Sequence, residues 1–256
     1  MVLDPSLCLR ADWPAPASVQ TLITTRMGGV SRGPWASLNP AAHVQDSPAD
    51  VAENRQRIRE TIGLDTDIQW LRQVHGVEVV TADSAQIEPE ADACFSAEAG
   101  VACAVMTADC LPVLLCDSKG AEIAAVHCGW RGLAAGILER AIKRFESAPH
   151  NLMAWMGPAI GPTAFEVGRD VLAAFDQRAT EASWATSAGI AFTPSANNKY
   201  LADIYTLARL ELNALGVTSI YGGGLCTVSD PLRFFSYRRD GVCGRMASLI
   251  WIKSSP

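Results

Sequence analysis

The chain is a succession of short apolar runs divided by polar or glycine-rich turns. Runs of this length that are partly β-branched are typical of buried strands. The pattern therefore predicts strands at residues 21–26, 68–74, 77–81, 101–106, 112–116, 123–127, 152–156, 217–221, 234–237 and 246–252.

Three segments instead have helical signals. Ser47 is a good N-cap before Pro48, and the helix that follows ends at Gly63. Residues 132–145 place their apolar side chains on one stripe, and residues 200–215 form a third helix. Helices and strands are mixed, and at least one tight hairpin is present, so the predicted fold class is α+β with mixed and antiparallel sheets.

Composition sets the size and class of the protein. The 256 residues are 49% hydrophobic and 19% charged, which is enough to bury one large core. Because single cores stop growing at about 250–300 residues, we expect a single domain over residues 1–256. The net charge of −6 argues against a nucleic-acid partner, since phosphate contacts need clustered Lys and Arg.

No segment predicts export or a membrane span. The N-terminal residues are interrupted by charge, and no apolar run approaches about 18 residues. We therefore expect a cytoplasmic protein whose eight cysteines are reduced. None of them forms a C-x-x-C pair, which excludes the commonest structural zinc patterns.

A hairpin between residues 110 and 127 is the first indication of a metal site. Its turn reads Asp-Ser-Lys-Gly at residues 117–120. If Ser118 and Lys119 are the two loop residues, Cys110 and His127 are direct cross-strand partners, with Cβ atoms roughly 4.5–5.5 Å apart. A one-residue slip would instead place them on opposite faces of the sheet.

His75, in the glycine-flanked segment at residues 73–76, is the candidate for a third ligand. Three protein ligands leave an open coordination position, which is the catalytic arrangement of zinc. Thiolate with imidazole suits Zn²⁺ first and copper second. Two readings remain open: Cys110 could be a nucleophile with His127 as its base, or the chain could be a binding module without catalysis. A lone cysteine on a strand is most often a buried packing residue.

Arginines beside glycine turns are candidate anion sites. Arg131 lies where a strand ends at His127 and a helix begins, and Arg26 precedes Gly28 and Gly29. Either side chain could hold phosphate or carboxylate. Packing at a common strand-to-helix turn, or an exposed surface arginine, would give the same pattern.

Taken together, the motifs resemble the YfiH-like, or laccase-domain, family of bacterial proteins, over nearly the whole chain. The matching segments are residues 24–31, 37–39, 43–44, 54–55, 73–76, 108–114, 127–132, 157–162, 165–168 and 234–241.

The resemblance implies a layered α/β/β/α sandwich that is usually monomeric. It places the metal ligands and catalytic centre on His75, Cys110 and His127. It also places Arg26, Asn39 and His43 in the pocket beside the metal. Cys128 departs from the small residue expected there, and we expect it to point away from His127 into the core.

The resemblance also implies a choice of activities. The preferred one is zinc-dependent purine nucleoside phosphorolysis with small-molecule nucleoside and phosphate as partners, together with adenosine deamination. For the deamination, His43 or Asp109 could serve as the general base. The alternatives are a copper polyphenol oxidase (laccase) and a zinc-dependent amide hydrolase that edits peptidoglycan precursors. A multicopper site needs about ten imidazole ligands, so four histidines disfavour the oxidase.

Overall fold

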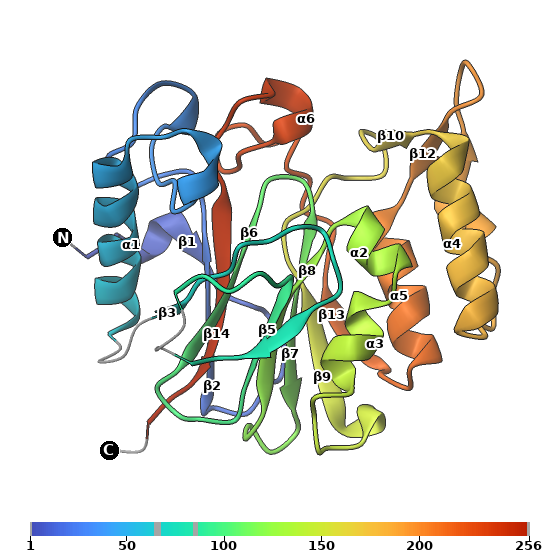
Figure 1. The fold of residues 1–256 in the computed structure, drawn as a ribbon, viewed down its shortest axis with the longest axis horizontal. Coiled ribbons are helices and arrows are strands. Elements are labelled where there is room, and N and C mark those ends of the chain that lie inside the picture. Colours follow the sequence, from blue (N-terminus) through green and yellow to red (C-terminus); the bar gives the residue numbers. More distant parts are fainter. Residues whose placement is uncertain (1, 64–67, 84–86, 255–256) are drawn as a thin grey trace.

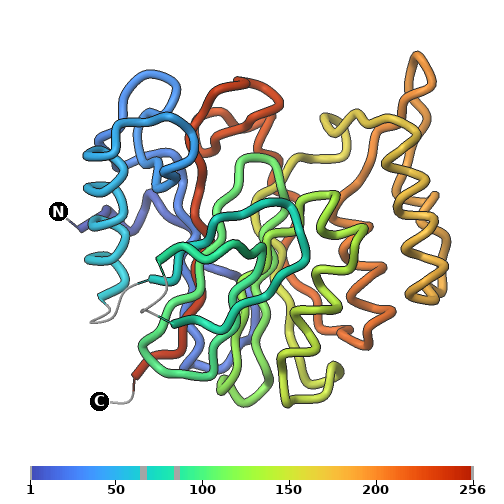
Figure 2. Tube along the Cα trace, in the orientation of Figure 1, coloured from blue at the N-terminus to red at the C-terminus, as the bar shows by residue number. Residues whose placement is uncertain are grey.

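The protein consists of two stacked β-sheets between helical layers, as the computed structural model shows for residues 2–63, 68–83 and 87–254 (Figure 1). The first sheet has the order β1-β2-β14-β6-β3. Its strands are β1 (Cys8–Leu9), β2 (Val19–Thr24), β14 (Met246–Ile252), β6 (Ala102–Thr107) and β3 (Ile68–Gln69). The central strand β14 pairs antiparallel with both neighbours, so the last strand of the chain lies beside β2 from its N-terminal part (Figure 2).

The second sheet has the order β13-β9-β7-β8-β5-β4. Its strands are β13 (Ser219–Gly222), β9 (Leu152–Met156), β7 (Leu111–Asp117), β8 (Ile123–Cys128), β5 (Ala93–Ser96) and β4 (Val79–Thr81). Both sheets combine parallel and antiparallel pairs. The predicted α+β class with mixed sheets is confirmed.

Three hydrophobic layers hold the sandwich together. The inter-sheet layer contains Ile23 and Ile250 from the first sheet and Leu114 and Ala125 from the second. Helix α1 (Pro48–Ile62) covers the outer face of the first sheet. The outer face of the second sheet is covered by α2 (Trp130–Ala134), α3 (Ile137–Ile142), α4 (Arg169–Glu181) and α5 (Ile204–Ala214).

Shorter elements complete the chain. A small sheet has the order β10-β12-β11 and is formed by β10 (Glu166–Val167), β12 (Tyr200–Ala202) and β11 (Phe192–Pro194). Helix α6 is Tyr237–Asp240, and 3-10 turns occur at Pro5–Leu7, Gly33–Trp35, Ala42–Val44, Pro149–Asn151 and Ala188–Ala191. Within the described ranges, no helix combines the length and the apolar character needed to cross a bilayer.

The first predicted helix forms as the sequence indicates. Ser47 accepts a hydrogen bond from the Asp50 amide, and Gly63 ends the helix in the left-handed conformation at φ 66°. The predicted single helix over residues 132–145 is wrong, because Gly136 at φ 88° divides it into α2 and α3. A Cβ at Gly136 would lie 3.0 Å from the Arg178 guanidinium, so the break also leaves room for that side chain.

Two further predictions are corrected. The helix predicted from residue 200 begins only at Ile204, because Asp203 caps it by accepting from the Tyr205 and Thr206 amides. The strand predicted at residues 234–237 is absent. Phe234 and Phe235 lie in a loop, and their apolar side chains are buried there.

The 110–127 hairpin forms with a different register. His127 pairs with Pro112, not with Cys110, because the loop has four residues rather than two. The Asp117 carboxylate accepts from the amides of Lys119, Ala121 and Glu122, which stabilises the wider turn. The shift amounts to two positions, so Cys110 and His127 keep the same face of the sheet.

Candidate metal centre and pocket

His75, Cys110 and His127 lie together at one end of the inter-sheet layer. Their ligand atoms are all within 4.8 Å of one another. The Cys110 Sγ to His75 Nε2 distance is 3.7 Å, and the two imidazole rings meet edge-on at 4.8 Å between centroids. Tetrahedral zinc with ordinary Zn–S and Zn–N bonds needs donors about 3.6 Å apart, so the three side chains fit a metal ion.

Three different elements supply these side chains. His75 lies on the loop between β3 and β4 with a left-handed backbone at φ 61°. Cys110 directly precedes β7, after Asp109 at φ 90°, and His127 is the penultimate residue of β8. Strand alternation directs both Cys110 and His127 toward the first sheet, because their neighbours Leu111 and Val126 face the helices.

Gly129 provides the space that the three ligands occupy. A Cβ at this position would lie 2.7 Å from the His75 ring, 3.3 Å from Cys110 Sγ and 3.4 Å from the His127 ring. Its backbone has ordinary extended angles. Glycine is therefore required here by proximity to the ligands and not by backbone conformation.

Asp92 is buried beneath the cluster. Its Oδ1 accepts from His127 Nδ1 at 2.7 Å and from the His75 amide at 2.9 Å. Its Oδ2 accepts from the Gly76 amide at 2.7 Å and the Val74 amide at 3.2 Å. Burial raises the pKa of this carboxyl, but the His127 contact and the amides outweigh burial and hold it below its usual value.

Cys110 and His127 form a charge-coupled pair. Burial raises the pKa of the Cys110 thiol, but the His127 and His75 rings outweigh it and lower the pKa to about 6. Burial likewise lowers the pKa of His127, but Cys110 and Asp92 outweigh it and raise the pKa to about 9. The thiol is therefore deprotonated near neutrality, as a metal ligand must be.

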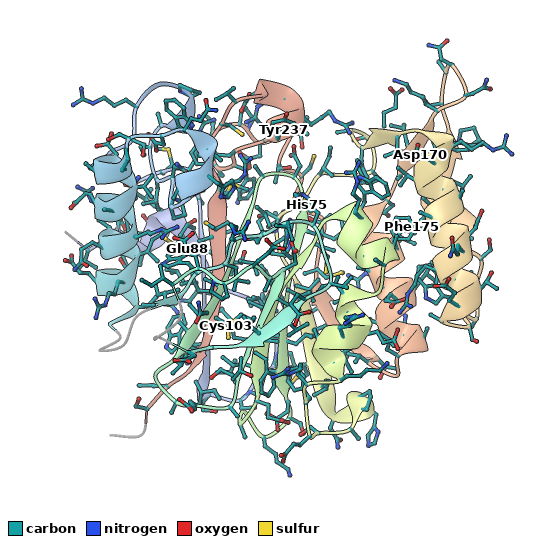
Figure 3. All side chains as sticks on the ribbon, in the orientation of Figure 1. His75, Glu88, Cys103, Asp170, Phe175 and Tyr237 are labelled. Carbon is teal, nitrogen blue, oxygen red and sulfur yellow. The ribbon has the colours of Figure 1, made fainter. Side chains whose placement is uncertain are left out.

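The cluster opens into a pocket of about 700 Å³. Predicted residues His43 and Arg131 line it, as does Asp109. Its far wall is formed by residues 165–168 and the start of α4. Figure 3 labels three of the lining residues in the upper half of the view, His75, Tyr237 and Asp170.

Arg26, predicted beside the metal, is not among the residues that line this pocket. Its Nε donates to the Ala36 carbonyl and its Nη1 to the Pro231 carbonyl, both at 3.1 Å. The guanidinium also stacks over the Phe235 ring at 4.8 Å. The Arg26 side chain therefore satisfies backbone carbonyls in two separate loops.

Asn39 is also absent from the lining, and it is fully buried. Its Nδ2 donates to Asp46 and to the Ala41 carbonyl, and its Oδ1 accepts from the amides of Ala41 and Arg245. The side chain of Arg245 does line the pocket. Asn39 thus contacts the pocket only through the backbone of a residue that does line it.

The two candidate bases differ in their hydrogen bonds. Asp109 Oδ1 accepts from Thr227 Oγ1 at 2.5 Å, and its Oδ2 accepts from the Arg238 amide at 2.6 Å. Among the described residues, none forms a hydrogen bond with the His43 ring. Burial, and then the charge of Arg245, lower the pKa of His43, so its imidazole is neutral at pH 7.

The remaining histidine and the extra cysteine lie where the sequence places them. His150 is exposed on the 3-10 turn at Pro149–Asn151. Cys128 is fully buried in the core beneath the helices, on the opposite face of β8 from His127.

Sequence reasoning missed Asp92, Gln73, Arg238 and Arg245. Gln73 stands directly before the His75 motif, and its amide exchanges two hydrogen bonds with the Met106 backbone. That adjacency was an available signal. Asp92 lies in none of the matched motifs, and only the folded sheets bring it to the ligands.

Comparison with known proteins agrees with this architecture. Residues 20–253 match the family described as multi-copper polyphenol oxidoreductase laccase. A purine nucleoside phosphorylase of Pseudomonas aeruginosa is 53% identical over 96% of this chain and 98% of its own length. The purine nucleoside phosphorylase YfiH of Escherichia coli is 49% identical over 94% of this chain and 96% of its own.

Solved structures show the same fold. A Neisseria meningitidis protein superposes with a TM-score of 0.91 at 50% identity, covering 97% of this chain and all of that one (100%). YlmD from Geobacillus stearothermophilus superposes with a TM-score of 0.88 at 31% identity, covering 96% of each chain.

Proposed function

Since the chain belongs to the multi-copper polyphenol oxidoreductase laccase family, we propose that it has the activity for which its relatives are named, purine nucleoside phosphorolysis. One observation carries the proposal: the His75, Cys110 and His127 cluster opens into a pocket that Arg131 also lines. The pocket volume of about 700 Å³ lies in the range of small-molecule sites and accommodates a nucleoside with phosphate.

The proposed metal is zinc, held by these three side chains. A thiolate with two imidazoles is a ligand set that zinc prefers, with copper as the second choice. The oxidase activity in the family description is not proposed here. A multicopper centre needs about ten imidazoles, and this chain has four histidines, of which His150 is remote from the cluster on an exposed turn.

Phosphorolysis replaces one bond by another at the sugar. An oxygen of hydrogen phosphate bonds to C1′ of the ribose while the C1′–N9 bond breaks, and the purine takes the bonding electron pair and the proton that the phosphate releases. The products are ribose 1-phosphate and the free base. A bound zinc ion supplies a Lewis acid with an open coordination position for this chemistry.

Arg131 is the proposed phosphate ligand. Its guanidinium stacks over the neighbouring Trp130 ring at 4.4 Å, and no hydrogen bond to another described residue engages it. Arg238 and Arg245 also line the pocket, but each donates to backbone carbonyls. Arg131 is therefore held in place while its donors stay available to phosphate oxygens.

His43 is the proposed general base. Its imidazole is neutral at pH 7 and can accept a proton, whereas both oxygens of Asp109 already accept hydrogen bonds. The same residues support adenosine deamination, in which water adds at C6 of the purine and ammonia leaves. We further propose that residues 1–256 act as a single catalytic domain, as a monomer, in the cytoplasm.

The test is to incubate zinc-loaded protein with inosine or adenosine, with and without phosphate. We expect ribose 1-phosphate and free base only when phosphate is present, and some inosine from adenosine in both cases. His75→Ala should reduce all products to background, and His150→Ala, which changes an exposed histidine, should leave them unchanged. If the zinc-loaded protein forms no free purine base above the His75→Ala background, the phosphorylase proposal is wrong. Amide hydrolysis is then the next activity to test.

A further inference from the structure

We propose that Asp92 is the positioning residue that sets the geometry of two metal ligands, His75 and His127, at once. The inference rests on the proposed metal centre and does not depend on which substrate the pocket takes. Asp92 is not among the residues that line the pocket, and no exposed surface remains on it.

The first step concerns the His127 ring. Because Asp92 Oδ1 accepts from Nδ1 at 2.7 Å, Nδ1 keeps its hydrogen, and Nε2 is the nitrogen that can release its proton and bind a metal. The ring is also fixed in rotation by this contact. Carboxylate partners of this kind orient metal-bound histidines and strengthen their binding to the metal. Asp92 therefore selects which nitrogen of His127 faces the metal.

The second step concerns the loop that carries His75. Val74 and His75 are exposed, so packing alone does not fix this loop. The Asp92 carboxylate accepts from three successive amides, those of residues 74, 75 and 76. These bonds hold His75 in its left-handed conformation at φ 61°, which is unfavourable for a residue other than glycine.

The third step concerns the backbone of Asp92 itself. Its carbonyl accepts from the His127 amide at 2.7 Å, and its amide donates to the Glu78 carbonyl at 3.1 Å. Both the main chain and the side chain of Asp92 thus join the start of β5 to β8 and to the His75 loop. The two ligands therefore share one rigid support, and that support is present before a metal binds.

Asp117 offers a matched control in the same sheet. It is as deeply buried as Asp92, and its carboxylate also accepts from three backbone amides, those of Lys119, Ala121 and Glu122. It lies at the opposite end of β7 from Cys110. Asp92→Asn and Asp117→Asn both remove a buried carboxylate that accepts hydrogen bonds from backbone amides. Only the Asp92 carboxylate contacts the metal ligands.

The experiment measures the zinc affinity of the full chain by competition with a chelator, without any nucleoside. Asp92→Asn should weaken zinc binding by about 10–100-fold, and Asp117→Asn should leave it unchanged. The Asp92 variant should also exchange its Val74, His75 and Gly76 amide hydrogens faster, because these amides donate to the Asp92 carboxylate.

Zinc affinity within about twofold of wild type in folded Asp92→Asn would overturn the proposal, as would an equal loss in Asp117→Asn. Should Asp92→Asn not fold, Asp92→Glu keeps the charge but displaces the carboxylate, and the same comparison of affinities decides. The outcome is independent of the phosphorylase assay. Weak zinc binding by Asp92→Asn supports the positioning role even in a protein that cleaves no nucleoside.

Discussion

At the scale of single residues, the metal centre depends on the absence of a side chain at Gly129. Gly129 follows β8 directly, and its Cα faces all three ligands. An added Cβ would overlap the His75 ring at 2.7 Å and would lie in tight contact with Cys110 Sγ at 3.3 Å and the His127 ring at 3.4 Å. Because the ligands come from three different elements, they cannot all move aside together.

Gly129→Ala should therefore weaken zinc binding while the protein stays folded. Overpacking of this kind costs about 1–3 kcal/mol, and we expect a loss of zinc affinity of about tenfold or more, measured by chelator competition. Gly189→Ala is the control, since Gly189 is exposed and meets only the Ser187 side chain at 3.3 Å. Equal zinc affinities of the Gly129 and Gly189 variants would show that the ligands tolerate the methyl group.

The thiol of Cys110 gives a second residue-scale prediction. Burial raises its pKa but the two histidine rings lower it to about 6, so in metal-free protein the reactive thiolate is present above pH 6 and is lost as the pH falls below it. The rate of alkylation by iodoacetamide at Cys110, followed by mass spectrometry, should rise with a midpoint near pH 6.

Cys8 provides an internal reference in the same sample. Burial raises the pKa of its thiol to about 11, so its alkylation should increase only at much higher pH. Zinc should protect Cys110 and leave Cys8 unchanged. A Cys110 midpoint near 8.5, the ordinary value for a free cysteine, would mean that the histidines do not stabilise the thiolate.

At the scale of elements, apolar runs and capping residues predict well where tertiary contacts do not compete. The helix with Ser47 and Gly63 at its ends and the strand at residues 246–252 form as predicted. The predictions fail where contacts with residues distant in sequence determine the local structure. Gly136 breaks a helix beside Arg178 from α4, and Phe234 is buried in a loop that its sequence does not distinguish from a strand.

The junction of β8 and α2 carries the element-scale prediction. Arg131→Ala should raise the KM for phosphate more than the KM for nucleoside. A hydrogen bond to a charged group contributes about 1.5–3 kcal/mol, so the expected rise is about tenfold or more in steady-state assays of phosphorolysis.

Arg140→Ala is the matched control, because Arg140 is an exposed arginine on the next helix, α3. It should leave both KM values unchanged. A rise in the nucleoside KM alone on Arg131→Ala would place the phosphate elsewhere in the pocket.

At the scale of the whole molecule, the site is assembled from segments that are distant in sequence. The motifs at residues 73–76, 108–114 and 127–132 predicted the ligand types, and the two sheets bring them together. Asp92 and Arg245 show what sequence could not predict. Their roles depend on contacts between segments that are distant in sequence, and no periodicity or spacing predicts those contacts.

This assembly implies that a bound metal stabilises the entire fold. The ligands lie on the β3–β4 loop, on the β6–β7 connection that joins the two sheets, and on β8. The unfolded chain cannot hold these side chains within reach of one ion. At free zinc about 100 times its Kd, binding should add about 2.7 kcal/mol to the free energy of unfolding, which for a domain of this size is a rise in Tm of about 5–10 °C.

Thermal unfolding of chelator-treated and zinc-loaded protein measures that rise. Cys110→Ala should show a much smaller shift, since two imidazoles remain without the thiolate that binds zinc most strongly. A wild-type Tm that does not change with zinc would argue that the ion binds outside this cluster, and so would an equal shift in the Cys110 variant. A rise in Tm that occurs only in the wild type would mean that one ion, held by residues 75, 110 and 127, joins the two sheets.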